Sequence, residues 1–417
     1  MSFDSLLAKA QLEGNCRLLE DYYEGTTHLD ALGVSLPPNV RLLEMVAPFP
    51  KFAVDVLTEA LNPEGFLLAG DKDIPALLRR WWQANNLDTA IKLAITEALV
   101  QGQAFLIIGY GTESTPRITV HTKRGMAVHR DHMGAVDEAL RVYTVDDIAY
   151  AAHYLPGETL YYRQDSGLWK PVDVQTHPGL DRPLVVPITN RLRIDDVDGR
   201  SEILDVVTIS DAASRTLTNM QVAQELLAMP VRYIFSDGIE SPATLEESLK
   251  SYFGHFIAGP DGGSAGQIPG ASLQSFIDAY KLYAQIISSI TGIPPSMLGI
   301  ATDNPASAEA MRVAKDRLIG RAEVKQDMFG DAIEDAARLA LALYGYDTAG
   351  LETLELSWRD PALTSASAKT ASMLQAQAQG VVSAETARDY LQLTPEQKAR
   401  ENAAAAELAA FRAQLGA

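Results

Sequence analysis

The spacing of apolar residues predicts two long helices in the second half of the chain. The first runs from about Ser272 to Thr291 and stops at Gly292-Ile293-Pro294-Pro295. The second runs from Pro305 to about Leu343, with Asn304 as its N-cap. At ~1.5 Å per residue the second helix would be about 58 Å long, whereas helices in compact domains average about 11 to 12 residues. A helix of this length must extend beyond a single domain core.

The apolar side of this second helix is interrupted by one charge, Lys325. Gly320 and Gly330 lie inside the pattern, and each costs about 1 kcal/mol relative to alanine, so we expect a bend at one of them. The alternative is an ordinary amphipathic helix that tolerates its glycines. The apolar positions are Met311, Ala314, Leu318, Ala322, Phe329, Ile333, Ala336, Ala340 and Leu343.

A third long helix is predicted from Ser201 to Met229, where Pro230 ends it. One of its sides is small and hydroxylated, which suits close contact with another helix or a non-adhesive lining; a solvent-facing polar side is the alternative. The hydroxylated side contains Thr208, Ser210, Ser214, Thr218 and Asn219.

A compact insert, residues 230–270, separates this helix from the Ser272 helix. It reads as a strand over 231–235, a short helix opened by the capping box of Thr244 and Glu247, and a glycine-rich loop over 259–270. The insert is therefore a small head between two helices.

The first half of the chain changes from a helical to a β pattern. Residues 1–87 read as helices broken by prolines, with Trp81-Trp82 as a core anchor, and a helix over 87–101 precedes a buried strand over 103–109. Short β-favouring runs then recur about every ten residues, which predicts an antiparallel sheet or small barrel. Prolines at 183 and 187 limit strand pairing, so they indicate an edge strand or the point where the chain leaves the sheet. The runs are 117–121, 126–130, 139–143, 149–154, 159–163 and 168–172.

Composition excludes several classes of protein. The 417 residues are 47% hydrophobic and 21% charged, which is typical of globular domains, and no apolar run approaches the ~18 residues that would span a bilayer. No secretory signal is predicted, and Cys16 is the single cysteine, so no disulfide framework is possible. A net charge of −19 argues against a protein that grips nucleic acid, because clustered Lys and Arg supply most non-specific affinity.

Catalytic patterns are weak in this chain. Ser264 lies in a G-x-S-x-G pattern, but no histidine follows His255 and no helix follows the pattern directly. His129 and His132 suggest a metal site, although residues three apart on a strand point to opposite faces. No metal or cofactor is predicted. Two alternatives stay open: an acidic cytosolic hydrolase that uses Ser264 or the His129/His132 pair, and a monomeric adaptor or scaffold protein.

The order of these elements, together with several short motifs, resembles the actinophage-type, or SPP1-like, branch of the tailed-bacteriophage portal family. None of the motifs is catalytic, and it is their order that is specific. They are Asn86-Leu87-Asp88, Gly102–Phe105, His177-Pro178-Gly179 with Pro187 to Asn190, Gly199–Ile203, Gly292–Pro295, Lys315–Leu318 and Trp358–Pro361.

The resemblance implies an α+β portal-type fold with named regions. These are a wing (1–200), a stem helix (201–229), a small α/β clip (230–270), a second stem helix (271–291), a tunnel-loop region (292–304), a long kinked helix (305–343), a wing strand (344–364) and a helical crown (365–417). A non-enzymatic ring, usually of about twelve subunits, would then stand at one capsid vertex as the channel for packaging and ejecting double-stranded DNA.

The same resemblance implies partners and site residues. The partners are the other subunits of the ring, the passing DNA, the terminase large subunit, the head–tail adaptor, and the major capsid and scaffold proteins, without a membrane. The protein would be found in the virion, and in the host cytoplasm during assembly. The site residues are Ile300, Ala301, Thr302, Asp303 and Asn304 for the tunnel loop; Asp237, Glu240, Glu246, Glu247 and Lys250 for clip docking; and Arg312, Lys315, Arg317, Arg321 and Lys325 for contacts with DNA or for ion pairs within or between subunits.

Charge in the stem and clip fits a channel that lets DNA slide. Residues 201–292 contain ten acids and four bases, a net charge of −6 per subunit. A lumen lined with Lys and Arg would release counterions and hold the duplex, whereas repelled phosphates favour movement.

Overall fold

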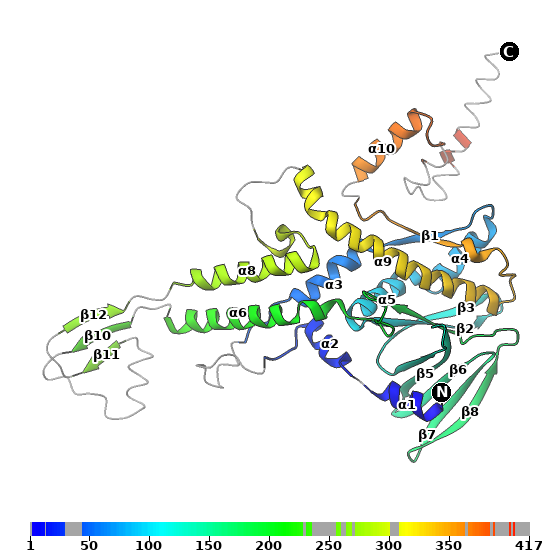
Figure 1. Cartoon of the computed structure of the whole chain (residues 1–417), viewed down its shortest axis with the longest axis horizontal. Coiled ribbons are helices and arrows are strands. Elements are labelled where there is room, and N and C mark those ends of the chain that lie inside the picture. Colours follow the sequence, from blue (N-terminus) through cyan, green and yellow to red (C-terminus); the bar gives the residue numbers. More distant parts are fainter. Residues whose placement is uncertain are drawn as a thin grey trace, which may run out of the picture. The chain divides into compact units, whose positions relative to one another are not determined.

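The computed structural model describes residues 2–12, 14–29, 44–227, 231–235, 256–259, 264–268, 272–300, 308–362 and 366–383, with a few residues near the C-terminal end. The chain divides into two compact units, Met1–Arg359 and Asp360–Ala417. The larger unit combines helices with β-sheets, which confirms the α+β prediction (Figure 1). In the smaller unit, helix α10 spans Ala366–Ala378, as expected for a helical region.

The β-rich middle of the chain forms two antiparallel sheets, with orders β3-β2-β9 and β4-β5-β6-β7-β8. All the predicted β runs are strands, but β3 pairs with the buried strand β2, and the other five form a separate open meander. The edge position predicted from the prolines is confirmed for β9. The strands are β2 (Gln103–Thr112), β3 (Thr115–Thr122), β4 (Met126–Arg130), β5 (Val136–Val145), β6 (Ile148–Leu155), β7 (Glu158–Asp165), β8 (Leu168–Thr176) and β9 (Val185–Thr189).

Helix α5 (Leu87–Gln101) has the predicted bounds and packs against β2 and β3. Asp88 lies in its first turn, and Gly102 ends it in the left-handed region with a φ of 83°. Trp81 and Trp82 are each 2% exposed, which confirms the predicted core anchor. The surrounding helices are α2 (Cys16–Glu24), α3 (Phe49–Ala60) and α4 (Asp73–Ala84).

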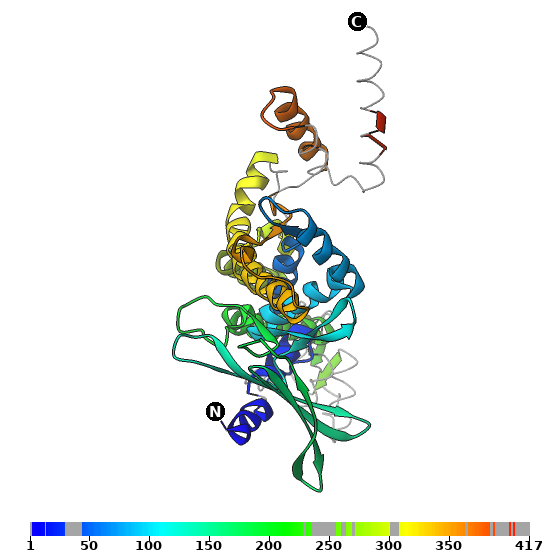
Figure 2. The ribbon, with the colours of Figure 1, turned by 90° about the vertical axis from the view of Figure 1, so that its right-hand side faces the viewer.

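Helix α1 (Phe3–Gln11) packs on one face of the five-stranded sheet (Figure 2). Leu6 and Ala10 of α1 are buried there against Ala127, Leu140 and Ala151. A short helix with two buried residues has too little periodicity to reveal this contact in the sequence.

Three long helices follow, and only the first differs from its predicted bounds by more than a turn. Instead of one helix from Ser201, a 3₁₀ turn over Glu202–Asp205 precedes α6 (Val207–Leu227). The adjacent residues Glu202 and Ile203 of this turn are both buried. Helix α8 spans Gln274–Thr291.

Helix α9 (Ala308–Leu343) contains 36 residues, about 54 Å at 1.5 Å per residue, and it changes direction along its course (Figure 2). A 3₁₀ turn over Pro295–Leu298 lies between α8 and α9. After α9, a further turn (Leu351–Thr353) leads into β13 (Glu355–Trp358), which pairs with β1 (Pro63–Leu67), a strand that the sequence analysis missed.

Helices α6 and α8 lie side by side (Figure 1). Their contact buries Ala213 of α6 against Ala284 and Ile287 of α8, with Leu217 and Tyr280 partly buried beside them. Small residues at the contact allow the two helix backbones to approach closely. The pair is thus held together by its own apolar seam.

The insert between α6 and α8 contains a small sheet of order β11-β10-β12. The strand prediction is confirmed for β10 (Val231–Phe235), and β11 spans Phe256–Gly259. The predicted glycine loop over 259–270 is partly wrong, because Ser264–Ile268 forms strand β12 antiparallel to β10. Pairing with β10 overrides the low strand propensity of glycine. The helix predicted from Thr244 lies outside the described residues.

Candidate stem and channel elements

The hydroxylated side of α6 is covered by an extended segment of the same chain. Ser210, Ser214 and Thr218 are all buried. Ser214 Oγ accepts from the Ala47 backbone N–H at 2.9 Å, Ser210 Oγ donates to the Ala47 carbonyl at 2.9 Å, and Thr218 Oγ1 accepts from the Met45 N–H at 3.0 Å. Ser210 and Ser214 thus both bond to Ala47, and Thr218, one turn further along the helix, bonds to Met45. This part of α6 binds its own chain, neither another helix nor a channel lumen.

Replacing Ser214 with alanine removes the acceptor of a buried N–H group. We expect the free energy of unfolding to fall by about 1 to 3 kcal/mol, since the Ala47 N–H is left unsatisfied. The matched control is Thr216→Ala, because the Thr216 hydroxyl donates to Ala212 O within its own helix. Denaturant unfolding of the purified variants measures both effects, and a control as damaging as Ser214→Ala would contradict the role of the segment.

A buried charged cluster joins α9 to the turn before α6. We name Glu202, Arg321, Lys325 and Asn190 the Glu202 cluster. Lys325 Nζ lies 2.8 Å from Glu202 Oε1, and Arg321 donates to the other carboxylate oxygen. Lys325 also donates to Asn190 Oδ1. Glu202 and Lys325 are 3% and 2% exposed, so this is a buried ion pair with its hydrogen bonds satisfied.

The charges around Glu202 keep it ionised. Burial is the largest influence on its pKa and acts to raise it. The charges of Lys325 and Arg321, with hydrogen bonds from Lys325 and Asn190, outweigh burial, so the pKa of Glu202 is lowered from its ordinary value. The carboxylate therefore stays charged at neutral pH and holds both cations.

Asn190 connects this cluster to the end of α5. Its backbone N–H donates to Gly102 O at 2.8 Å, and its Nδ2 donates to Arg200 O at 2.7 Å and to Glu202 Oε1 at 3.2 Å. Around this junction the chain crosses itself closely. A Cβ on Gly199 would lie 1.8 Å from Gly102 O, so only glycine fits there.

Arginines of α9 also cap the C-terminal end of α8. Arg317 donates to Ser289 O, and Arg321 donates to Thr291 O. Carbonyl groups at a helix C-terminus lack partners within the helix and carry partial negative charge, so guanidinium groups stabilise them. Gly292 follows with a φ of 75°, and a Cβ there would lie 3.0 Å from Arg317 Cγ. The first half of α9 is thereby fixed to the turn before α6 and to the C-terminal end of α8.

The glycines predicted to bend α9 have different surroundings. A Cβ on Gly330 would lie 3.2 Å from Trp358 Nε1, whereas a Cβ on Gly320 would meet nothing within 4 Å. Gly330 thus allows β13 to approach α9, a packing role that the helix pattern alone does not reveal.

Of the five predicted cations, Arg317, Arg321 and Lys325 bond within the chain. This arrangement supports the alternative of ion pairs within a subunit, and a residue as buried as Lys325 offers no surface to DNA. Lys315 is partly buried on α9, and the side chain of Arg312 lies outside the described part. Sequence reasoning missed Glu202 and Asn190, although the charge at Lys325 in an apolar stripe was a signal for a buried anion.

Most of the other predicted site residues lie outside the described residues. In the tunnel loop only Ile300 is described, packed beside the α6–α8 seam; Ala301, Thr302, Asp303 and Asn304 are not. The clip candidates Asp237, Glu240, Glu246, Glu247 and Lys250 also fall outside the described ranges.

The residues of the hydrolase alternative do not form a recognisable site. Ser264 begins strand β12, whereas a nucleophile elbow needs a sharp turn between a strand and a helix. His129 Nδ1 pairs with Asp137 at 2.6 Å across the β4–β5 hairpin. Among the described residues there is no cluster of three or more metal-ligating side chains, and none of the described helices has the length and apolarity to cross a membrane.

The negative charge predicted for the stem is not evenly distributed. Glu202 is neutralised by α9, and Asp205 pairs with Arg200 at 2.5 Å. The helices α6 and α8 themselves contain three acids and two bases, whereas residues 237–261 contain five acids and one base. The acidic excess therefore belongs mainly to the insert, and helices α6 and α8 are nearly neutral.

Comparison with known proteins identifies the family. Residues 9–410 match the family described as phage portal protein, SPP1 Gp6-like. The chain is 35% identical over 396 residues to the portal protein of Mycobacterium phage D29, covering 90% of this chain and 81% of the relative. It is 34% identical over 390 residues to the portal protein of Mycobacterium phage L5, covering 88% and 80%.

A solved structure shares the fold. A chain in the neck of an empty GTA particle, computed with C6 symmetry, superposes with a TM-score of 0.50 at 18% identity, covering 84% of this chain and 91% of that one. The fold, the family match and the mycobacteriophage relatives agree with the resemblance noted in the sequence. The chain therefore belongs to the SPP1 Gp6-like family of phage portal proteins.

Proposed function

We propose that this portal protein forms a closed ring of about twelve copies at a capsid vertex, and that double-stranded DNA passes through the ring during packaging and ejection. Its role is structural and involves no catalysis. The insert between α6 and α8 would dock the terminase large subunit and later the head–tail adaptor, while the wing would contact capsid and scaffold proteins. Assembly would take place in the host cytoplasm, before the ring becomes part of the virion.

The observation that carries this proposal is the pair α6–α8, clamped at one end by α9. A channel needs stiff walls, and here the apolar seam, the hydroxyl contacts to Met45 and Ala47, and the Glu202 cluster all fix the pair. Three independent sets of contacts therefore hold the two helices against the force of moving DNA.

The charges of this pair suit a surface along which DNA slides. The two bases, Arg215 and Lys281, follow Asp211 and Asp278 by four and three residues, so each cation has a carboxylate on the same helix face. Few cations remain to neutralise phosphates, and counterion release is correspondingly small. The acidic insert adds repulsion at its end of the stem.

The mass of the purified assembly tests the ring. Twelve copies of the 45.2 kDa chain give about 540 kDa, and we expect native mass spectrometry to find this species, or one with a neighbouring subunit number. The measurement needs several salt concentrations, because copies with a charge of −19 repel one another at low ionic strength. A species that stays at 45.2 kDa in every buffer, with scaffold protein present, would contradict the proposal.

A further inference from the structure

Helix α8 has a second apolar face, which its contact with α6 does not use. That contact is made by Ala284 and Ile287, which are 1% and 0% exposed. Leu282 lies on the far side of the helix, because at about 100° per residue it is about 160° from Ala284 and about 140° from Ile287. Leu282 is 54% exposed. The face around Leu282 is therefore available for contact with another chain.

Leu282 belongs to an uncharged strip that runs along α8, which we name the α8 strip. Its positions are three or four residues apart, so they share one side of the helix. All of them are exposed or half-buried, and the Ser289 hydroxyl donates to Ile286 O at 2.8 Å within the helix. Covering this strip would therefore bury no charge. The positions are Ser275, Ala279, Leu282, Ile286 and Ser289.

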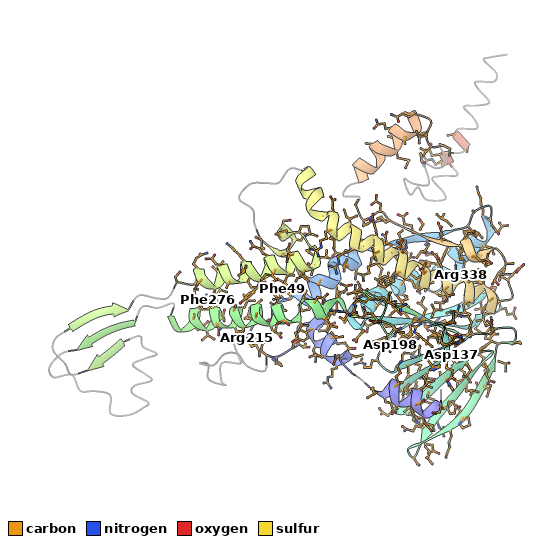
Figure 3. The ribbon with its side chains drawn as sticks, in the orientation of Figure 1. Phe49, Asp137, Asp198, Arg215, Phe276 and Arg338 are labelled. Carbon is orange, nitrogen blue, oxygen red and sulfur yellow. The ribbon has the colours of Figure 1, made fainter. Side chains whose placement is uncertain are left out.

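Helix α6 carries an uncharged strip of smaller residues, which we name the α6 strip. It is separate from the side of α6 that binds residues 45–47, and the Thr216 hydroxyl donates to Ala212 O at 3.0 Å within the helix. Figure 3 labels Arg215, which borders this strip on α6, and Phe276 on α8. Small side chains let another helix approach closely. The strip, exposed or half-buried throughout, consists of Thr208, Ala212, Thr216, Asn219 and Ala223.

The absence of charge suits these two strips to contact between copies. Chains with a net charge of −19 repel one another, so they associate best through surfaces that carry little charge of their own. The ten positions of the two strips contain no acid and no base. Protein interfaces likewise have few charged residues at their centres. Two copies can therefore meet along these strips without placing like charges against each other.

We propose that the α8 strip packs against the α6 strip of the neighbouring copy, with Leu282 as the central anchor. The inference rests on the proposed ring. Where the α6–α8 pair of every copy faces one bore, the far side of α8 must meet α6 of the next copy. The contact joins two different surfaces, which is the head-to-tail arrangement that closes a ring of identical chains. A large side chain against small residues also follows the packing of ridges into grooves.

The variant Leu282→Asp tests the anchor. We expect the subunit affinity to fall at least about 30-fold, the loss typical of a hot-spot residue, so that native mass spectrometry at low micromolar protein shows mainly monomers. Ile277→Asp is the matched control, because Ile277 is 40% exposed on the same helix, about 140° from Leu282, and its rings should persist. Thermal melting of both variants checks that the fold is intact. Rings formed normally by folded Leu282→Asp, or lost equally in both variants, would overturn the proposal.

Crosslinking with a short bismaleimide identifies the two surfaces in contact. Cys16 is the single native cysteine and is buried, so the reagent reacts preferentially with the double variant Leu282→Cys with Thr216→Cys. In its rings we expect a ladder of joined chains that starts at about 90 kDa, two copies of 45.2 kDa, whereas a link within one chain leaves 45.2 kDa. Each single variant is a control and should give no ladder.

The outcomes separate this contact from the proposed function. Rings of the double variant that give no ladder, or single variants that crosslink equally well, would overturn the contact between the strips while the portal function stands. If the unmodified chain forms no ring, the proposed function fails instead.

Discussion

Replacing Glu202 with alanine is expected to lower the free energy of unfolding by about 3 to 5 kcal/mol, the loss typical when one partner of a buried ion pair is removed. The variant leaves Lys325 buried at 2% exposure without its carboxylate, and it takes from Arg321 and Asn190 a shared acceptor. The midpoint of denaturant unfolding, at an unchanged slope, measures this loss.

Two comparisons separate the ion pair from a general effect of losing a charge. Glu323→Ala removes an exposed carboxylate of the same helix α9 and should change stability by less than about 0.5 kcal/mol. The double variant Glu202→Leu with Lys325→Met removes both buried charges and should recover much of the loss, because apolar residues of similar volume can replace a buried pair. A single Glu202→Ala variant as stable as the parent chain would contradict the assigned role of the cluster.

The pH dependence provides a second readout of the same pair. Because the pKa of Glu202 is lowered in the folded chain, its contribution to stability is present above the unfolded pKa, near 4.5, and is lost as the pH falls through the lowered folded value. The stability difference between the parent chain and Glu202→Gln should therefore be constant around pH 6 to 8 and shrink only below about pH 4.5.

Replacing Gly199 with alanine is expected to be at least as damaging, and to prevent normal folding of the region around Asn190. Gly199 has a φ of +77°, and an added Cβ would lie 1.8 Å from the Gly102 carbonyl oxygen, so one of the two backbone segments must move. The cost combines about 1 to 2 kcal/mol for the left-handed conformation with a backbone clash, and should exceed about 4 kcal/mol.

Gly179→Ala is the matched control for this substitution. Gly179 has a φ of +89°, and an added Cβ would meet nothing within 4 Å, so only the conformational cost of about 1 to 2 kcal/mol applies. The yield of folded protein and the unfolding midpoint measure both variants. Equal losses in the two would show that backbone strain, and not the crossing of Gly199 over Gly102, explains the effect.

Local signals explain which parts of the fold could be predicted from the sequence. Asp88 in the first turn of helix α5 and Gly102 at its C-terminal end both stabilise the helix through local backbone effects, so both are visible in the sequence. The strands β4 to β8 show the alternation and turns of a meander. The break before α6 was missed because Ile203, Val206 and Ile209 are three apart, a spacing that both a 3₁₀ turn and an α-helix produce.

Features that depend on distant segments could not be predicted. The hydroxyl stripe of α6 indicated a close contact, but nothing in the sequence says that residues 45–47 cover it. Strand β12 exists because β10 pairs with it. The charge at Lys325 was visible inside an apolar stripe, yet its partner Glu202 lies in another motif, 123 positions earlier in the sequence.

Several of the motifs that carried the family resemblance meet around the Glu202 cluster. Gly102, Asn190 and Gly199 form the chain crossing, and Gly292 and Arg317 form the junction of α8 with α9. These residues hold together the end of α5, the turn before α6, the end of α8 and the first half of α9. A channel protein needs such joints because its walls must keep their places while DNA moves.

Electron cryomicroscopy of the purified chain tests the central claim most directly. The account predicts a closed ring with a central bore, in which the α6–α8 pair of every subunit faces the bore. A ring whose bore is lined by other elements, with α6 and α8 at its outer circumference, would contradict the account, as would particles of single chains without a bore.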